Sequence, residues 1–258
     1  MKRSWMAGIA ALLTLVCFNG QAQDRQLFNH LSLGITLGVD GVGADLALPV
    51  SPFVQLRAGY AIFPYTFKKT YEVNGEFAGL ELSAFPASFT LWEKGNGKLL
   101  MDVFLGKKTP FHLTAGVYAG AGRFIHWEAD WQFQTEEEDR ATRSFTYRGF
   151  TFSTDADGVV KADARMKHWV PYVGLGYGRA VDPGKHLSIS ADLGVLITGG
   201  IQVQTYDFVG NPDGTPVMLT SSNLVTPGGR QLDRGWTDRA ARWPVLPMLR
   251  INVFFHLF

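Results

Sequence analysis

Hydrophobic and polar residues alternate along much of this chain with a period of two. In the stretch HLSLGITLGV, residues 30–39, leucine, isoleucine and valine fill the odd positions, while histidine, serine, threonine and glycine fill the even ones. Successive side chains of a β-strand point to opposite faces, so this stretch predicts a strand with one apolar and one polar face. The alternation recurs in seven further segments, which are residues 43–50, 53–63, 98–105, 112–124, 169–180, 187–199 and 247–258.

The connections between these predicted strands differ in length in a regular way. Three of them are short and contain the Pro, Gly and Ser residues of tight turns, namely residues 48–52, 106–111 and 182–186. They alternate with the three longest connections, which cover residues 64–97, 125–168 and 199–244. An up-and-down sheet collects such long connections at one end, as transmembrane β-barrels do.

We therefore predict an all-β fold, a closed antiparallel up-and-down transmembrane barrel of about eight strands with long external loops. A hairpin added by residues 76–84 and 145–153 would raise the number to ten strands. A secreted β-sandwich is the alternative, although its Greek-key crossovers do not regularly collect long loops at one end. An even number of strands places both termini at the end with the short turns, which is periplasmic in such barrels.

The first 22 residues have the features of a secretory signal. Lys2 and Arg3 precede an apolar run, and the small residues Gly20 and Ala22 stand at the −3 and −1 positions of a cleavage site. We expect residues 1–22 to be a signal peptide and residues 23–258 to form one outer-membrane barrel domain.

Composition narrows the class of protein further. The chain has 24 basic and 23 acidic residues, of which only Lys2 and Arg3 lie in the signal, so the mature charge is close to zero and does not favour nucleic acid as a partner. The only cysteine also lies in the signal, so disulfides cannot hold the mature chain. After the signal, no apolar run reaches the roughly 20 residues of a membrane helix.

Several charged residues fall on the polar face of the predicted strands. Since the interior of a barrel of about eight strands is filled by side chains, these residues should be buried there. A buried unpaired charge costs several kcal/mol, so we expect each arginine to bridge two carboxylates and the set to plug the lumen. A gated ion path or a catalytic cluster is the alternative role for this set, which comprises Asp45, Arg57, Asp102, Asp192 and Arg250.

Aromatic residues gather near the strand ends that adjoin the long loops. Rings at such positions can lie at the level of the lipid headgroups and form an external girdle. A carbohydrate-binding platform is the alternative, because exposed aromatic rings stack on sugars. The predicted girdle comprises Tyr60, Phe63, Tyr65, Phe124, Trp127, Trp169 and Tyr172, while Trp131 and Trp236 lie farther out.

The predicted loops also contain candidate metal ligands and catalytic groups. The acidic run 136–139 could supply oxygen ligands to Ca²⁺, but it lacks the spacing of a preformed calcium loop, and residues 155–158 suggest a hairpin tip. His126 lies near Glu128 and Asp130, yet no nucleophile, base and orienting group can be assembled around it. We therefore predict neither an enzyme nor a metal or other cofactor.

The segments 31–60, 98–124 and 170–196, together with the terminal Phe258, resemble the small outer-membrane β-barrel proteins of Gram-negative bacteria, closest to those of Bacteroidetes, with an OmpA/OmpX-like barrel architecture. The resemblance implies contact with outer-membrane lipid and lipopolysaccharide. It also implies that the barrel-assembly machinery reads Phe258 together with an aromatic residue two places earlier, where this chain has His256.

The function implied is non-enzymatic. We expect envelope integrity, or surface contact and adhesion to an extracellular ligand through the long loops. Two alternatives remain open at this point, a narrow passive channel for small solutes and an outer-membrane enzyme that acts on lipid A or peptides.

Overall fold

The computed structural model describes residues 30–77, 80–120, 122–132, 136–147, 150–182, 184–218 and 244–257. The predicted signal peptide (1–22), Trp236 and Phe258 lie outside these residues, so the signal cleavage and the assembly signal stay predictions. The described residues form β-strands and one short 3₁₀ helix, η1 (Glu137–Asp139). Within the described ranges, no helix combines the length and the apolar character needed to cross a membrane.

Eight strands form a closed barrel in which every neighbouring pair is antiparallel. The first strand closes the barrel against the last, with partners running from Ser32 and His256 to Gly38 and Arg250. The all-β, up-and-down barrel of eight strands is therefore confirmed, and closure excludes the sandwich. In order around the barrel the strands are β1 (Ser32–Gly38), β16 (Val245–His256), β13 (Leu187–Ile197), β12 (Trp169–Tyr177), β7 (Phe111–Ala119), β6 (Asn96–Phe104), β3 (Val54–Ile62) and β2 (Gly41–Ser51).

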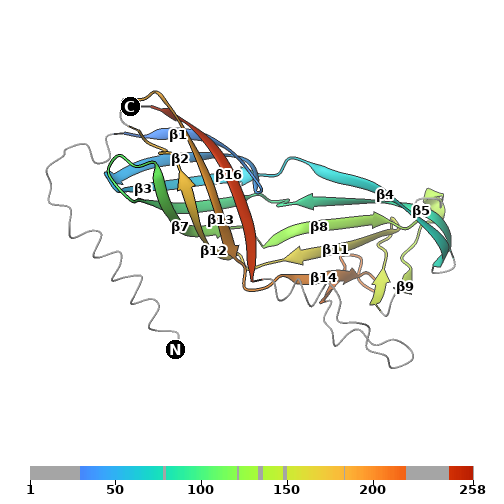
Figure 1. Cartoon of the computed structure of the whole chain (residues 1–258). Coiled ribbons are helices and arrows are strands. Elements are labelled where there is room, and N and C mark those ends of the chain that lie inside the picture. The colour runs from blue at the N-terminus through green and yellow to red at the C-terminus, as the bar shows by residue number, and fades with distance from the viewer. Residues whose placement is uncertain are drawn as a thin grey trace, which may run out of the picture.

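A second sheet extends from one end of the barrel, and we call it the extension sheet. Figure 1 shows it running away from the barrel end opposite the C-terminus, with several of its strands continuing the barrel strands. Its six strands, in spatial order, are β15 (Thr215–Met218), β14 (Gln202–Asp207), β11 (Val159–Arg165), β8 (Arg123–Asp130), β5 (Leu80–Leu91) and β4 (Thr66–Phe77).

The three longest connections were expected to be loops, and the extension sheet shows that this expectation is wrong. Each of them contains β-strands among its described residues, and these strands hydrogen-bond to one another beyond the barrel rim. The predicted extra hairpin exists in part, since residues 76–77 belong to β4 and residues 80–84 to β5, while β9 (Ser144–Tyr147) pairs with β10 (Phe150–Ser153). Neither pair enters the barrel, so ten barrel strands is wrong.

The leucine-rich face of the barrel points outward. Leu33, Leu56 and Leu193 are 42%, 37% and 62% exposed, whereas the polar residues that alternate with such leucines along each strand are buried. Glycines on the inner face make room for large inner side chains. A Cβ atom on Gly34 would lie 2.5 Å from the ring of Phe254, and one on Gly176 would collide with the imidazole of His112. The apolar and polar faces of each barrel strand thus have the opposite arrangement from a soluble barrel.

Candidate functional site

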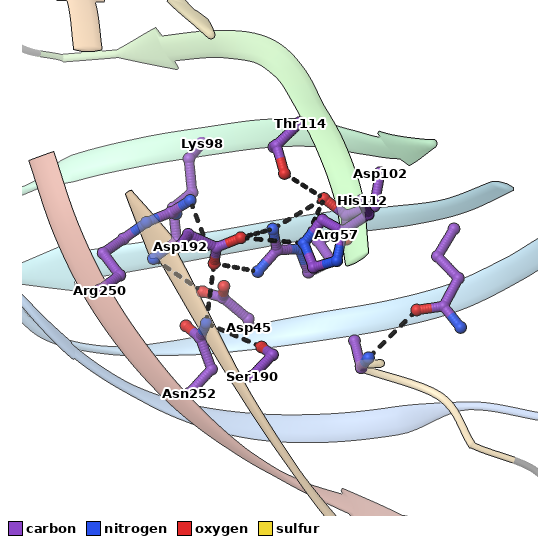
Figure 2. Close-up of polar contacts among 12 residues, drawn as sticks. Asp45, Arg57, Lys98, Asp102, His112, Thr114, Ser190, Asp192, Arg250 and Asn252 are labelled. Carbon is purple, nitrogen blue, oxygen red and sulfur yellow. Dashed lines mark hydrogen bonds and ion pairs between the residues drawn. The ribbon is translucent and has the colours of Figure 1, made fainter. Parts of the chain in front are cut away.

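The centre of the barrel holds a buried cluster of charges built around Arg57. Its guanidinium, which projects from β3, lies 2.8 Å from a carboxylate oxygen of Asp102 on β6 and 2.8 Å from one of Asp192 on β13 (Figure 2). The hydroxyl of Thr114 donates a hydrogen bond of 2.8 Å to Asp102. His112 lies 3.2 Å from Asp192. Arg57 therefore bridges two carboxylates that come from different walls of the lumen.

Asp45, the third predicted carboxylate, pairs with a lysine instead of an arginine. The ammonium of Lys98 lies 3.0 Å from Asp45 and 3.8 Å from Asp40, and all three side chains are buried. Lys98 has the same strand phase as Asp102, so its inward position was readable from the sequence even though the candidate set omitted it. His112 was likewise omitted, although it is on the polar face of β7.

Arg250 departs from the expectation that it bridges two carboxylates. It lies 3.6 Å from Asp192, and its guanidinium stands 5.1 Å and 5.8 Å from the ring centroids of Tyr172 and Tyr118. Two aromatic faces, which attract a cation, take the place of the second carboxylate. The predicted girdle position of Tyr172 is therefore wrong, because its side chain is 1% exposed and points into the lumen, as its even strand position requires.

The charged centre is sealed by apolar layers at both ends of the barrel. At the end next to the extension sheet, the buried cluster consists of Trp92, Leu100, Tyr118, Met166, Val170, Tyr172, Leu196 and Met248. At the end with the short turns, Ala180 and Val181 fold inward against Ala47 and Phe254. Gln55 holds this turn in place: its side-chain amide donates to the carbonyl of Val181 over 2.6 Å and accepts from the amide of Ala180.

Within the described part of the chain, one group of side chains has the composition of a metal site. The ligand atoms of Asp102, His112 and Asp192 lie within 4.8 Å of one another. However, the guanidinium of Arg57 already bonds both carboxylates and places its positive charge between them. A divalent cation would have to compete with this charge at close range, so these residues fit a structural salt-bridge cluster better than a metal site.

The other predicted girdle residues fall into two groups. Tyr60, Tyr65 and Trp169 are exposed near the barrel rim, as an interfacial ring requires. Phe63 and Phe124 instead pack against the apolar cluster inside the barrel, and Trp127 lies in β8 between its strand partners Phe89 and Ala162. At the opposite end, the sequence reasoning missed the exposed rings of Phe111, Tyr177 and Phe255, which lie beside the short turns.

A second polar cluster lies on the extension sheet around His126. Its Nδ1 atom lies 2.6 Å from Asp163 on β11, and its Nε2 atom lies 3.2 Å from Glu128. The hydroxyl of Tyr206 on β14 donates to the other oxygen of Asp163 over 2.5 Å. The hydrogen bonds to Asp163 and Glu128 raise the pKa of His126 to about 9, so the imidazole is protonated at neutral pH.

This geometry does not suit His126 for catalysis. A protonated imidazole has no lone pair to act as a base, and both of its N–H groups already donate to carboxylates. Asp130, which the sequence placed near His126, contacts Arg140 over 3.4 Å instead. The cluster ties β8, β11 and β14 together.

A pocket of about 480 Å³ opens beside this cluster. Arg123, His126, Lys161 and Tyr206 line it from the strands, and the turn that contains residues 155–158 forms part of its wall. In that turn Asp155 accepts the amide N–H groups of Asp157 and Val159, so the carboxylate fixes the turn. The acidic run 136–139 is exposed, forms η1 and is not part of the pocket lining.

Comparison with known proteins gives distant structural matches. The chain is similar to CarO2 of Acinetobacter baumannii, with a TM-score of 0.46, 15% identity and coverage of 90% of this chain and 100% of the other. It is also similar to a major outer membrane protein of Thermus thermophilus, with a TM-score of 0.34, 16% identity and coverage of 88% and 99%. Ail of Yersinia pestis, solved with a heparin analogue, gives a TM-score of 0.25, 9% identity and coverage of 88% and 97%.

No family model matches the chain, and no curated protein sequence matches it. The evidence that this chain has the architecture of a small outer-membrane β-barrel is therefore the closed strand pairing and the outward apolar face of its own structure.

Proposed function

We propose that this chain is a non-enzymatic outer-membrane protein whose barrel anchors the extension sheet at the cell surface, where that sheet makes surface contacts. The observation that carries the proposal is the inverted barrel, with apolar side chains exposed around its outside and ion pairs buried at its centre. A barrel surface of this kind is stable against acyl chains and would aggregate in water.

The filled lumen supports an anchoring role over a transport role. An apolar layer lies at each end of the barrel, and the Arg57 cluster lies between the two layers. In an eight-stranded barrel such side chains occupy the space that a solute would need. The elaborate part of the protein is the extension sheet, which lies on the side opposite the short periplasmic turns in this proposal.

The experiment replaces residues 123–165 by a short Gly-Ser turn. Because β7 and β12 are hydrogen-bonded neighbours from Phe111 and Tyr177 to Ala119 and Trp169, a short turn can join them without breaking the barrel. We expect the variant to enter the outer membrane. In gel electrophoresis with detergent it should migrate differently before and after boiling, as closed barrels do, because every strand edge is paired and the unheated barrel stays folded.

The functional readout is retention of cells that display either form on surfaces coated with matrix protein or with glycans. Retention that falls to the level of non-expressing cells for the replaced form, while the heat-dependent migration persists, supports surface contact through the extension sheet. A wild-type chain that stays soluble in the periplasm contradicts the proposal.

A further inference from the structure

The floor of the pocket is one polar face of the extension sheet, from which His126, Lys161 and Tyr206 contribute to the lining. In β8, β11 and β14 the side chains of His126, Asp163 and Gln204 are cross-strand partners in register, so they share one face of the sheet. The neighbouring Lys161 and Tyr206 lie on that same face. The turn around Asp157 and the segment around Phe208 rise beside this floor and complete a cavity of about 480 Å³. This volume is in the range of small-molecule sites.

The cations of the pocket are already neutralised. Each of the three cationic side chains in the lining has a carboxylate partner within 4 Å, and the pairs are Arg123 with Glu93 and Asp163, His126 with Asp163 and Glu128, and Lys161 with Asp155. Two further carboxylates in the lining, Asp157 and Asp213, are exposed. An anionic ligand would thus meet paired cations and additional negative charge, which disfavours it.

Aromatic rings lie beside these hydrogen-bonding groups. The ring of Tyr206 lies 6.4 Å from that of Phe208, and the ammonium of Lys161 stands 5.7 Å from the Phe208 centroid. A ligand that fits must offer many groups able both to donate and to accept hydrogen bonds, together with an apolar face that can pack on a ring. Sugars have both properties, since their hydroxyls ring the molecule and their C–H groups form its faces.

We propose that this pocket binds a neutral sugar unit of a cell-surface glycan. The inference rests on the proposed surface contact function and names the chemistry of its ligand. The ion pairs supply donors and acceptors held at fixed positions, so the hydroxyls of a sugar find preorganised partners without removing an unpaired charge from water.

The test uses the full-length protein refolded in detergent and a panel of neutral disaccharides, lactose, maltose and cellobiose, detected by saturation-transfer NMR and titration. Ala156→Trp places a bulky ring in the pocket wall, and Lys161→Met removes one donor while keeping the aliphatic stem. Lys185→Met is the matched control, because Lys185 also forms an ion pair with an aspartate, 2.6 Å from Asp182, in a turn at the far end of the barrel.

We expect saturable binding of at least one neutral disaccharide, weakened about tenfold or more by Ala156→Trp and Lys161→Met and unchanged by Lys185→Met. Sulfated heparin fragments should bind more weakly than the neutral sugar. The proposal is overturned if no disaccharide of the panel binds, if Ala156→Trp leaves binding intact, or if only the sulfated fragments bind.

The heat-dependent migration of the same samples separates the two proposals. A sample with the migration shift but no sugar binding rejects the sugar site and leaves the membrane anchor standing. A sample with neither heat shift nor membrane insertion rejects the anchor, and with it the surface contact function on which the sugar site rests.

Discussion

At the scale of single residues, Arg57 has the largest consequence for stability. Replacing it with Met leaves Asp102 and Asp192 buried without their shared partner, although Arg250 stays 3.6 Å from Asp192. Breaking a buried pair in this way costs about 3–5 kcal/mol, so we expect the free energy of unfolding to fall by that order. Urea unfolding in detergent measures the change. Arg140→Met, which removes the partly exposed ion pair with Asp130, is the control, with an expected loss of about 1 kcal/mol or less.

His126 gives the extension sheet a pH dependence whose sign follows from its raised pKa. The folded pKa is about 9 against an unfolded value of 6.5, so the stabilisation is complete below pH 6.5 and is lost as the pH rises through 9. Unfolding of the extension sheet, followed by the fluorescence of Trp127 in a variant whose other tryptophans are replaced by phenylalanine, should therefore require less urea at pH 10 than at pH 6. His126→Gln should flatten this dependence. An unchanged pH profile in that variant would show that another group titrates.

Residue positions were more predictable than residue partners. Period-two alternation is sufficient to send Asp45, Arg57, Asp102, Asp192 and Arg250 to the inside, where the structure places all five. Partners depend on which strands face each other across the lumen and on how far each side chain reaches, and no local pattern encodes either. The sequence pattern therefore did not reveal that Asp45 pairs with Lys98 instead of an arginine.

At the scale of elements, the barrel strands followed from the sequence and the extension strands did not. On each barrel strand the outward positions are apolar because they contact lipid, and the inward positions are mostly polar or small, apart from the apolar layers at the two ends of the lumen. In the extension sheet both faces carry mixtures such as Lys69, Tyr71 and Glu72, and bulges shift the register between Glu72 and Gly75 and between Ala164 and Arg165. The pairing there joins segments far apart in the chain, which a period of two cannot reveal.

Removing the hairpin of β4 and β5 should loosen β8 of the extension sheet and leave the barrel intact. β3 pairs directly with β6, so a Gly-Ser linker in place of residues 66–90 keeps the barrel ladder, while β8 loses one of its two neighbours. We expect retained heat-dependent migration and faster amide exchange in β8, read by hydrogen exchange with mass spectrometry. Loss of the migration shift would mean that the hairpin is needed to close the barrel.

At the scale of the whole molecule, three successive layers of side chains close the lumen. The apolar cluster at the end next to the extension sheet, the Arg57 cluster, and the inward turn of Ala180 and Val181 are separate layers. Opening one layer therefore leaves two in place. The inward turn has a tie that a single substitution removes, because the guanidinium of Arg179 donates to the carbonyls of Pro52, Gly106 and Lys107, while Gln55 holds the turn from the other side.

Both the wild type and Arg179→Ala should accordingly be silent in planar bilayers, since a narrow barrel filled with side chains holds no continuous water path. Single-channel recording checks this, with a general porin in the same membranes to show that inserted barrels are detected. Discrete steps from the wild type would restore the passive channel as the function. Steps from Arg179→Ala alone would show that the inward turn is the working seal, and that the two layers above it let ions through.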